Sequence, residues 1–192
     1  MNISTPEIKW AKNALKNNEV ICEKIIANTD YSFVVEIQCK NRLFFLKKNH
    51  SLFNYEDKLL SYLYQSGINN LNIYHQNQDL NCFITENCGV QITNVAEHCI
   101  SIADKFIEIQ LKSNPIILAD IGLRRFSTSE ISYLCYKYQI HSEHLLKYWN
   151  EIEKVIPLSL EHGDFHLGNI LIDENEKIVF IDLAEGTITN PL

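Results

Sequence analysis

The sequence from Leu158 to Leu183 reads LSLEHGDFHLGNILIDENEKIVFIDL and contains the features that decide the fold. Two apolar runs, at residues 170–172 and 177–181, lie on either side of a polar segment at residues 173–176. Short apolar runs around a polar turn are typical of a β-hairpin. The sequence therefore predicts two antiparallel strands joined by a tight turn.

This hairpin places two polar side chains together. If Ile172 faces Ile178 across the turn, the start of the first strand lies beside the end of the second. Asn169, before the first strand, and Asp182, after the second, then become neighbours. An amide oxygen and a carboxylate suit a hard cation such as Mg²⁺, which takes its remaining ligands from phosphate and water.

A glycine-containing loop at residues 162–168 precedes the hairpin and carries Asp164. In this loop Asp164 can face a substrate hydroxyl rather than the metal, so a base is separate from the metal-binding pair. A single Asp, Gly or Asn usually marks only an ordinary turn. Here the loop, the hairpin and the terminal Asp182 follow one another in one interval, and this context favours the functional interpretation.

The residues HGDFHLGNIL followed by FIDL resemble the signature of the aminoglycoside phosphotransferase family, small-molecule kinases related to protein kinases. Protein kinases usually carry HRD, so Gly163 and His166 favour the small-molecule branch. The resemblance implies an α+β, protein-kinase-like fold of two lobes, with a small antiparallel sheet in the first and mainly helices in the second. It also implies that Asp164 is the catalytic base and that Asn169 and Asp182 bind Mg²⁺, with ATP or GTP as the phosphoryl donor.

The nucleotide-binding half should then lie upstream. The run Arg42 to Lys47 is apolar, rich in strand-forming residues and ends in Lys, which resembles the strand that carries the phosphate-binding lysine of kinases. Glu56 opens a helical pattern that stops at Gly67. The resemblance implies that Glu56 pairs with Lys47 and holds it toward the phosphates. Lys48 is the rival lysine, but alternation along a strand turns it to the opposite side.

Two further segments are assigned through the resemblance. Residues 81–89 form a short strand and a polar connection, where the backbone C=O near Thr85 and the N–H near Asn87 would bind the adenine edge. Residues 25–37 form two strands and the turn that covers the phosphates. This turn contains no glycine, and Ser32 is the expected phosphate contact, with Asp30 pointing away.

The middle of the chain predicts helices. Residues 94–112 place an apolar stripe on one side, and this stripe is expected to form core. Ser127 to Glu130 is a capping sequence for a helix through Tyr138, and a further helix begins at residue 141 or 142 and ends before Pro157. The stripe consists of Val95, Cys99, Ile102, Ala103, Phe106 and Ile109.

Composition excludes several classes of protein. At 192 residues and 46% hydrophobic residues the chain can bury a core, and its net charge of -7 argues against a nucleic-acid-binding role, which needs a basic face. No apolar stretch reaches membrane-spanning length, and the polar start does not resemble a signal peptide, so a cytoplasmic location is expected. The six cysteines form no CxxC pair and are expected to be buried free thiols, and His141 and His144 are expected at the surface.

The resemblance predicts a nucleotide-binding lobe at residues 1–89 and a helical lobe at residues 90–192 that carries the catalytic loop and the hairpin. Family members usually continue beyond the second metal-binding Asp into further helices, whereas this sequence stops at Thr189-Asn190-Pro191-Leu192. A shortened second lobe would expose apolar surface, so self-association or a covering partner is expected.

Two alternatives to a kinase with a small-molecule hydroxyl acceptor remain open. The first is a nucleotide-binding module that has lost acceptor binding. The second is a metal-dependent phosphoesterase, because Gly163 to His166 resembles a GDxH metal motif, although the additional motifs of that class are missing from the sequence. Nothing in the sequence identifies the acceptor or separates ATP from GTP.

Overall fold

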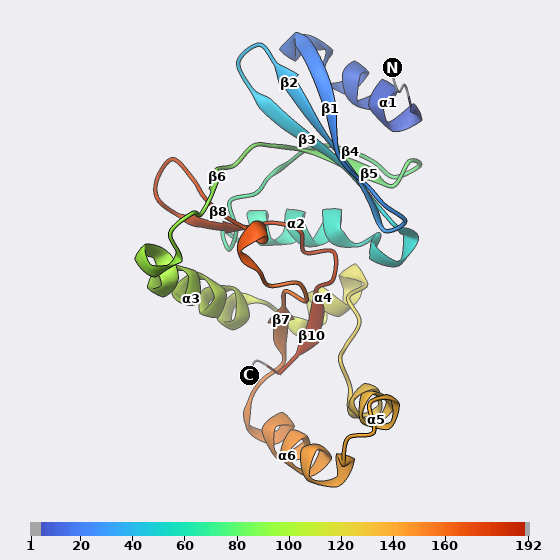
Figure 1. Ribbon diagram of the computed structural model, residues 1–192, viewed down its shortest axis with the longest axis vertical. Coiled ribbons are helices and arrows are strands. Elements are labelled where there is room, and N and C mark those ends of the chain that lie inside the picture. Colours follow the sequence, from blue (N-terminus) through green and yellow to red (C-terminus); the bar gives the residue numbers. More distant parts are fainter. Residues whose placement is uncertain (1–4, 191–192) are drawn as a thin grey trace.

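The computed structural model describes residues 5–190. Pro191 and Leu192, the last residues of the predicted second lobe, lie outside the described residues. An antiparallel sheet of five strands forms one end of the molecule (Figure 1). Its strands, in order across the sheet, are β1 (Val20–Asn28), β2 (Ser32–Cys39), β3 (Leu43–Asn49), β5 (Cys82–Glu86) and β4 (Ile73–Asn77). The two strands and the turn predicted between residues 25 and 37 are thus present.

Two helices cover opposite faces of this sheet (Figure 1). Helix α2 (Glu56–Gln65) was predicted, whereas α1 (Pro6–Ala14) was not, although Thr5 caps its first turn and Pro6 occupies its first position. On the α1 face, Ile8 and Leu15 pack with apolar residues of β2 and β3 in a closed core cluster. Two short 3-10 helices, η1 (Lys16–Asn18) and η2 (Ser51–Phe53), lie in the connections.

The predicted hairpin is present with the predicted register. Strands β8 (Ile170–Ile172) and β9 (Ile178–Phe180) pair with Ile172 opposite Ile178, and β6 (Val90–Gln91) adds a third strand. Strands β7 (Ser159–Glu161) and β10 (Thr187–Thr189) form a separate pair, and η3 (Leu167–Asn169) precedes β8. A second core cluster joins α2 and β5 to the hairpin. The division into lobes at residue 89 therefore stays a prediction.

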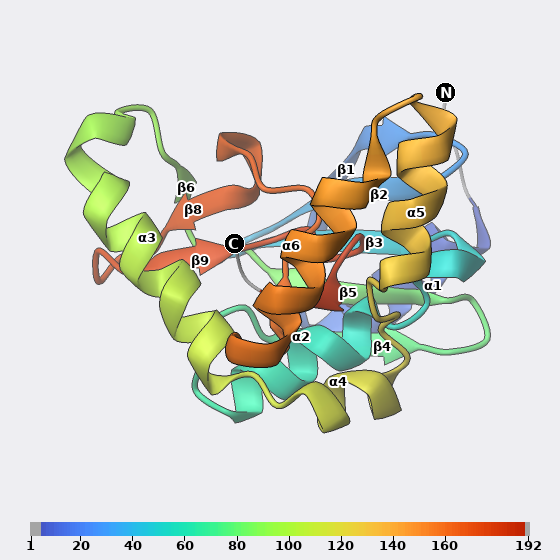
Figure 2. The same cartoon turned by 90° about the horizontal axis from the view of Figure 1, so that it is seen from below.

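Four helices form the rest of the second half: α3 (Val95–Lys112), α4 (Pro115–Ile121), α5 (Thr128–Lys137) and α6 (Ser142–Val155). Three of them were predicted, and the capping box of α5 is formed by Ser127 and Glu130. Figure 1 shows α5 and α6 at the end farthest from the sheet, and Figure 2 shows α3 beside β9. Within residues 5–190, no helix combines the length and apolar character needed to cross a membrane.

Burial differs from the expectation at α3 and at the cysteines. Of the predicted stripe, only Ile102 and Ile109 are buried, because the rest of this side borders an open apolar hollow instead of a packed element. All six cysteines are free thiols, but Cys22 and Cys99 are exposed, since each lies on a face of its element that nothing in the described part of the chain covers. His141 and His144 are exposed, as predicted.

Candidate active site

Lys47 lies at the centre of a group of charges between the sheet and the hairpin, in which Glu56 is buried and Asp182 is exposed. Its Nζ is 2.8 Å from Glu56 Oε2 and 2.6 Å from Asp182 Oδ1. The predicted ion pair with Glu56 is therefore present, and it extends to Asp182, 135 residues away. Lys48 turns to the α1 face, where its Nζ lies 2.5 Å from Glu7 Oε1, as strand alternation predicts.

Glu56 connects α2 to the segment that carries Asp182. It is 1% exposed, and besides Lys47 it accepts hydrogen bonds from the Asn49 side-chain amide and, at 3.0 Å, from the Leu183 N–H. Burial opposes the charge of Lys47, but the carboxylates of Glu56 and Asp182 outweigh it and raise the lysine pKa above its usual value. The ammonium group is thus charged at physiological pH and held in one place.

Asp182 has a backbone conformation that suits a functional position. Its φ of 56° lies in the left-handed region, which is uncommon for residues other than glycine and is often found at functional sites. The Ile181 N–H donates to the Asn169 backbone O at 3.0 Å, so Asn169 and Asp182 are neighbours at the open end of the hairpin, as predicted.

The Asn169 side chain is oriented by Asp164. Its Nδ2 donates to the Asp164 backbone O at 3.0 Å and to Asp164 Oδ2 at 3.2 Å. Among the hydrogen bonds of residues 5–190, none engages Asn169 Oδ1, the other polar atom of the amide. A carboxamide oxygen and a carboxylate at one hairpin end form a donor set that fits Mg²⁺. Within residues 5–190 no group of three or more His, Cys, Asp or Glu side chains could hold a metal, so this pair would need phosphate and water as further ligands.

Gly163 and His162 hold the loop against the Asp182 segment. Gly163 has a φ of 82°, and a Cβ at this position would lie 2.1 Å from the Glu185 backbone O, so the close approach requires glycine. His162 is 2% exposed, and its Nε2 lies 3.0 Å from the Ile181 backbone O. Burial lowers the pKa of His162, which keeps the ring neutral at physiological pH.

Tyr55 is a further contact to this segment that the sequence interpretation missed. Its hydroxyl donates to the Ala184 O at 2.6 Å and to the Gly186 O at 3.1 Å. These bonds fix the chain just after Asp182 to the start of α2. No local pattern indicates this role, because Tyr55 and its acceptors are about 130 residues apart.

The two backbone groups predicted to bind adenine are engaged within the sheet. Thr85 pairs with β3 on one side and β4 on the other, and the Asn87 N–H donates to the Leu43 O at 2.8 Å. Backbone groups of an antiparallel strand alternate in direction, so the Glu86 C=O and the Cys88 N–H face away from β3. Among the described residues no hydrogen bond engages the Cys88 N–H. The binding of adenine near Thr85 and Asn87 stays a prediction, and the nearby groups that face away from β3 belong to Glu86 and Cys88.

Ser32 lies on the same side of the sheet as the charged group. It pairs with Asn49, and Val34 pairs with Lys47, so the side chains of Ser32 and Lys47 share one face. The turn itself offers few free donors, because the Tyr31 and Ser32 N–H groups donate to Thr29 Oγ1 at 3.2 and 3.0 Å. Ser32 would therefore contact a phosphate through its hydroxyl.

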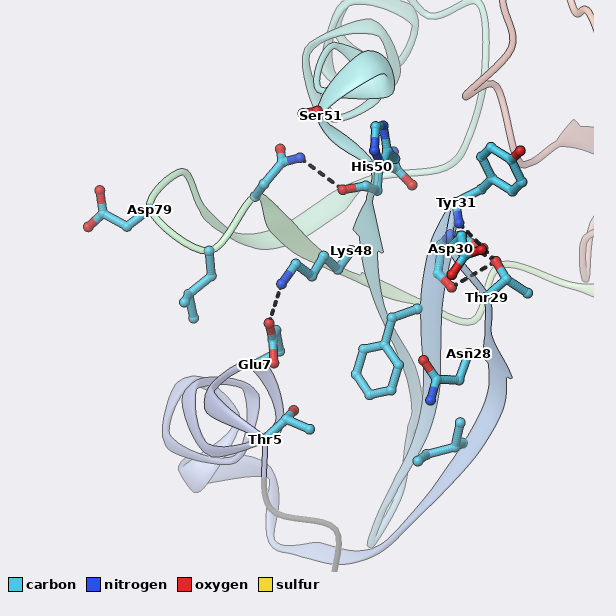
Figure 3. A pocket seen from close by; sticks show the side chains of 16 residues that line it. Thr5, Glu7, Asn28, Thr29, Asp30, Tyr31, Lys48, His50, Ser51 and Asp79 are labelled. Atoms are coloured by element: carbon cyan, nitrogen blue, oxygen red, sulfur yellow. Dashed lines mark hydrogen bonds and ion pairs between the residues drawn. The ribbon is translucent and has the colours of Figure 1, made fainter.

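One sizeable cavity does not include the charged group around Lys47. It has a volume of about 590 Å³ and lies on the α1 side at the end of the sheet, around the ion pair of Glu7 and Lys48 (Figure 3). A second hollow, of about 440 Å³, adjoins the catalytic loop between α3 and the start of β8. Its lining is apolar except for His166, and it includes the exposed side chains of Phe165 and Leu167.

Comparison with known proteins gives a family match and many structural matches. The family model described as the phosphotransferase enzyme family matches residues 135–192, which contain the catalytic loop and the hairpin. This match confirms the resemblance that HGDFHLGNIL and FIDL indicate. Comparison with curated protein sequences gives no significant match.

Three of the structural matches are small-molecule phosphotransferases. Choline kinase LicA from Streptococcus pneumoniae has a TM-score of 0.69 at 13% identity, with 97% of this chain and 72% of that chain covered. Macrolide 2'-phosphotransferase MphH from Brachybacterium faecium has a TM-score of 0.63 at 10% identity, with 97% and 75% covered. A spectinomycin phosphotransferase in complex with ADP and spectinomycin has a TM-score of 0.59 at 16% identity, with 99% and 71% covered. The chain thus has the predicted protein-kinase-like α+β fold.

Proposed function

We propose that the protein is a phosphotransferase that moves the γ-phosphoryl group of ATP, with Mg²⁺, to a hydroxyl group of a small molecule. The observation that carries this proposal is the meeting of Lys47 and Glu56 with Asp182, which lies 135 residues from Lys47, next to Asn169 and Asp164. Buried charges are costly and are retained where they are paired or needed. The family match and the structural neighbours support the same activity.

Each residue has a role in the proposed reaction. Asp164, whose side chain is 48% exposed, aligns the acceptor hydroxyl and takes its proton. The acceptor oxygen then forms a bond to the γ-phosphorus, the bond between that phosphorus and the bridging oxygen of ADP breaks, and ADP leaves. Lys47 and Ser32 position the phosphates, while Glu56 holds Lys47.

The Asn169 side chain would contact the metal through its amide oxygen and the proposed base, Asp164, through its amide nitrogen. Asn169 Oδ1 and Asp182 would hold Mg²⁺, which offsets the charge of the phosphates. The Asn169 Nδ2 group keeps its bonds to Asp164, so binding of the cation and orientation of the base are coupled through one side chain. The adenine edge would bind the Glu86 C=O and the Cys88 N–H.

The acceptor can be searched for directly. Purified protein, Mg-ATP and a panel of alcohols are incubated, and ADP formation is measured. The panel includes aminoglycosides, choline, homoserine and alcohols with an apolar ring or chain, because the hollow beside the catalytic loop is apolar. We expect one acceptor to raise ADP formation above the rate with water and to be recovered as its phosphate ester.

The matched control is Asp164→Asn, which keeps the shape of the side chain and removes the base. Turnover should fall by about 10²- to 10⁴-fold while Mg-ATP binding measured by calorimetry is kept. Mg-ATP binding without transfer to any alcohol or to water would instead favour the nucleotide-binding module. Phosphate release from phosphate esters without ATP would favour the phosphoesterase.

A further inference from the structure

His166 lies beside Asp164 and has a different partner at each ring nitrogen. Its Nδ1 accepts the Gly168 N–H at 2.9 Å, and its Nε2 is 3.4 Å from Asp164 Oδ2. Because Nδ1 is an acceptor, the proton of the neutral ring belongs on Nε2. The ring thus places Nε2 beside the carboxylate of the proposed base, at 3.4 Å from its Oδ2.

The loop at residues 162–168 leaves space for the His166 ring. A Cβ at Gly168 would lie 2.6 Å from Cε1 and 2.9 Å from Nδ1 of His166, so the ring occupies the space that any other residue would fill. The same side chain caps η3, the turn that delivers Asn169 to the hairpin. His166 is therefore placed by the turn between the proposed base and the proposed metal ligand.

The two oxygens of the Asp164 carboxylate have unequal surroundings. Oδ2 accepts from Asn169 Nδ2 at 3.2 Å and lies near His166 Nε2. Within the described part of the chain, Oδ1 takes part in no hydrogen bond or ion pair. One hydrogen bond and one close imidazole contact lie on the same oxygen, and the other oxygen is left open.

We propose that His166 is a positioning residue that holds Asp164 through Nε2–H, so that Oδ1 faces the acceptor hydroxyl. This inference rests on the proposed phosphotransferase function. The acceptor proton goes to Asp164 Oδ1, and His166 neither gains nor loses a proton in the step. The effect of His166 is to orient Asp164. Displacement of a catalytic group is expected to lower turnover more than it lowers nucleotide binding.

The first test determines which nitrogen of the His166 ring carries the proton. The full chain is labelled with ¹⁵N, and the two-bond ¹H–¹⁵N spectrum of its imidazoles is recorded at about pH 8, above the ordinary His pKa. We expect His166, assigned by its loss in His166→Gln, to be the Nε2–H tautomer. In Gly168→Ala the added Cβ displaces the ring, and the spectrum should change to a mixture of tautomers. An Nδ1–H or mixed tautomer in the unaltered protein would overturn the inference.

The second test measures ADP formation from Mg-ATP with water as the acceptor. His166→Leu should lower kcat by about 10- to 100-fold and leave the KM for Mg-ATP unchanged. His166→Gln, which keeps a side-chain N–H, should recover part of the loss. His144→Leu makes the same change at an exposed position of α6 and should match the unaltered protein.

A double-mutant comparison separates positioning from general damage to the loop. Once Asp164→Asn has removed the base, adding His166→Leu should cost less than about twofold more. An additive loss, or an increase of KM at constant kcat, would contradict the inference. If the unaltered protein never consumes Mg-ATP, the proposed function fails, and the tautomer in the ¹⁵N spectrum still decides whether His166 is aimed at Asp164.

Discussion

The two faces of the five-stranded sheet differ in what they bury. On the α1 face, Phe44 and Leu46 of β3 lie in a closed apolar cluster. On the other face the intervening strand positions carry Lys47, which is fixed by carboxylates from α2 and from the hairpin end. The cavity of about 590 Å³ and the single ion pair of Glu7 with Lys48 lie on the α1 side, whereas the group of three charges around Lys47 lies opposite. In this protein, the lysine that is held by two carboxylates marks the candidate site better than cavity size does.

The strongest test of this difference compares two adjacent lysines. Lys47→Met removes the charge that we assign to the phosphates, and turnover of Mg-ATP should fall by about 10²- to 10³-fold. Lys48→Met makes the same change on the α1 face and should alter turnover little, because Lys48 pairs with Glu7 and points away from the site. Equal losses in the two variants, measured as kcat/KM, would show that the faces do not differ in function.

Glu56 is the buried hydrogen-bond acceptor on the sheet face that carries Lys47. Among substitutions of polar residues, its replacement should lower the free energy of unfolding most. Glu56→Gln leaves Lys47 with only Asp182 and weakens the bond from the Leu183 N–H. The free energy of unfolding should fall by about 3 kcal/mol, the lower end of the range for breaking a buried pair, because Asp182 remains. Urea unfolding of this variant and of the unaltered protein measures the difference, and a change below about 1 kcal/mol would contradict a buried network.

The α1 face should contribute to stability and not to turnover. Leu46 is fully buried in the apolar cluster, so Leu46→Ala should lower the free energy of unfolding by about 2–5 kcal/mol. Turnover per folded molecule should stay within about twofold, since the side chain points away from Lys47. Thermal unfolding and ADP formation at a temperature well below the transition measure the two quantities separately. A loss of turnover in fully folded protein would contradict the division between the faces.

A smaller contribution to the free energy of unfolding comes from Glu7 and depends on pH. Burial works against the charge of Glu7, but the hydrogen bond from Lys48, further hydrogen bonds from the backbone and from Thr5, and the charge of Lys48 together outweigh burial and lower the Glu7 pKa below 4.5. The folded state therefore binds this proton less readily than the unfolded state. The stabilisation is present above pH 4.5 and is lost as pH falls through the folded pKa. In Glu7→Gln, urea unfolding measured across this acidic range should show a shallower decline with falling pH, and an unchanged slope would exclude Glu7 as its source.

Local structure was predictable where neighbouring residues decide it. The register of β8 and β9 follows from one polar turn between two apolar runs, and the start of α5 follows from the capping sequence of Ser127 and Glu130. Two helices were missed despite comparable signals. Thr5 and Pro6 open α1, while Asn114 and Pro115 open α4 and Gly122 ends it.

The backbone contacts of the site were less predictable. The engagement of the Asn87 N–H depends on whether Leu43 of β3 lies beside it, which is a property of strand pairing and not of the local sequence. The orientation of His166 similarly depends on a hydrogen bond within a folded turn. Each of these contacts has an energy comparable to that of its alternatives, so a residue pattern does not select among them.

The sequence by itself determined the hairpin, the loop before it, the strand with Lys47 and the helix that begins at Glu56. Only the tertiary structure decided that Asp182 joins the pair of Lys47 and Glu56, that Tyr55 holds the segment after Asp182, and that one side of α3 is left open. The reason is physical. Hairpins and helix ends are set by interactions between residues close in the chain, whereas burial and charge pairing depend on segments more than 100 residues apart being packed together.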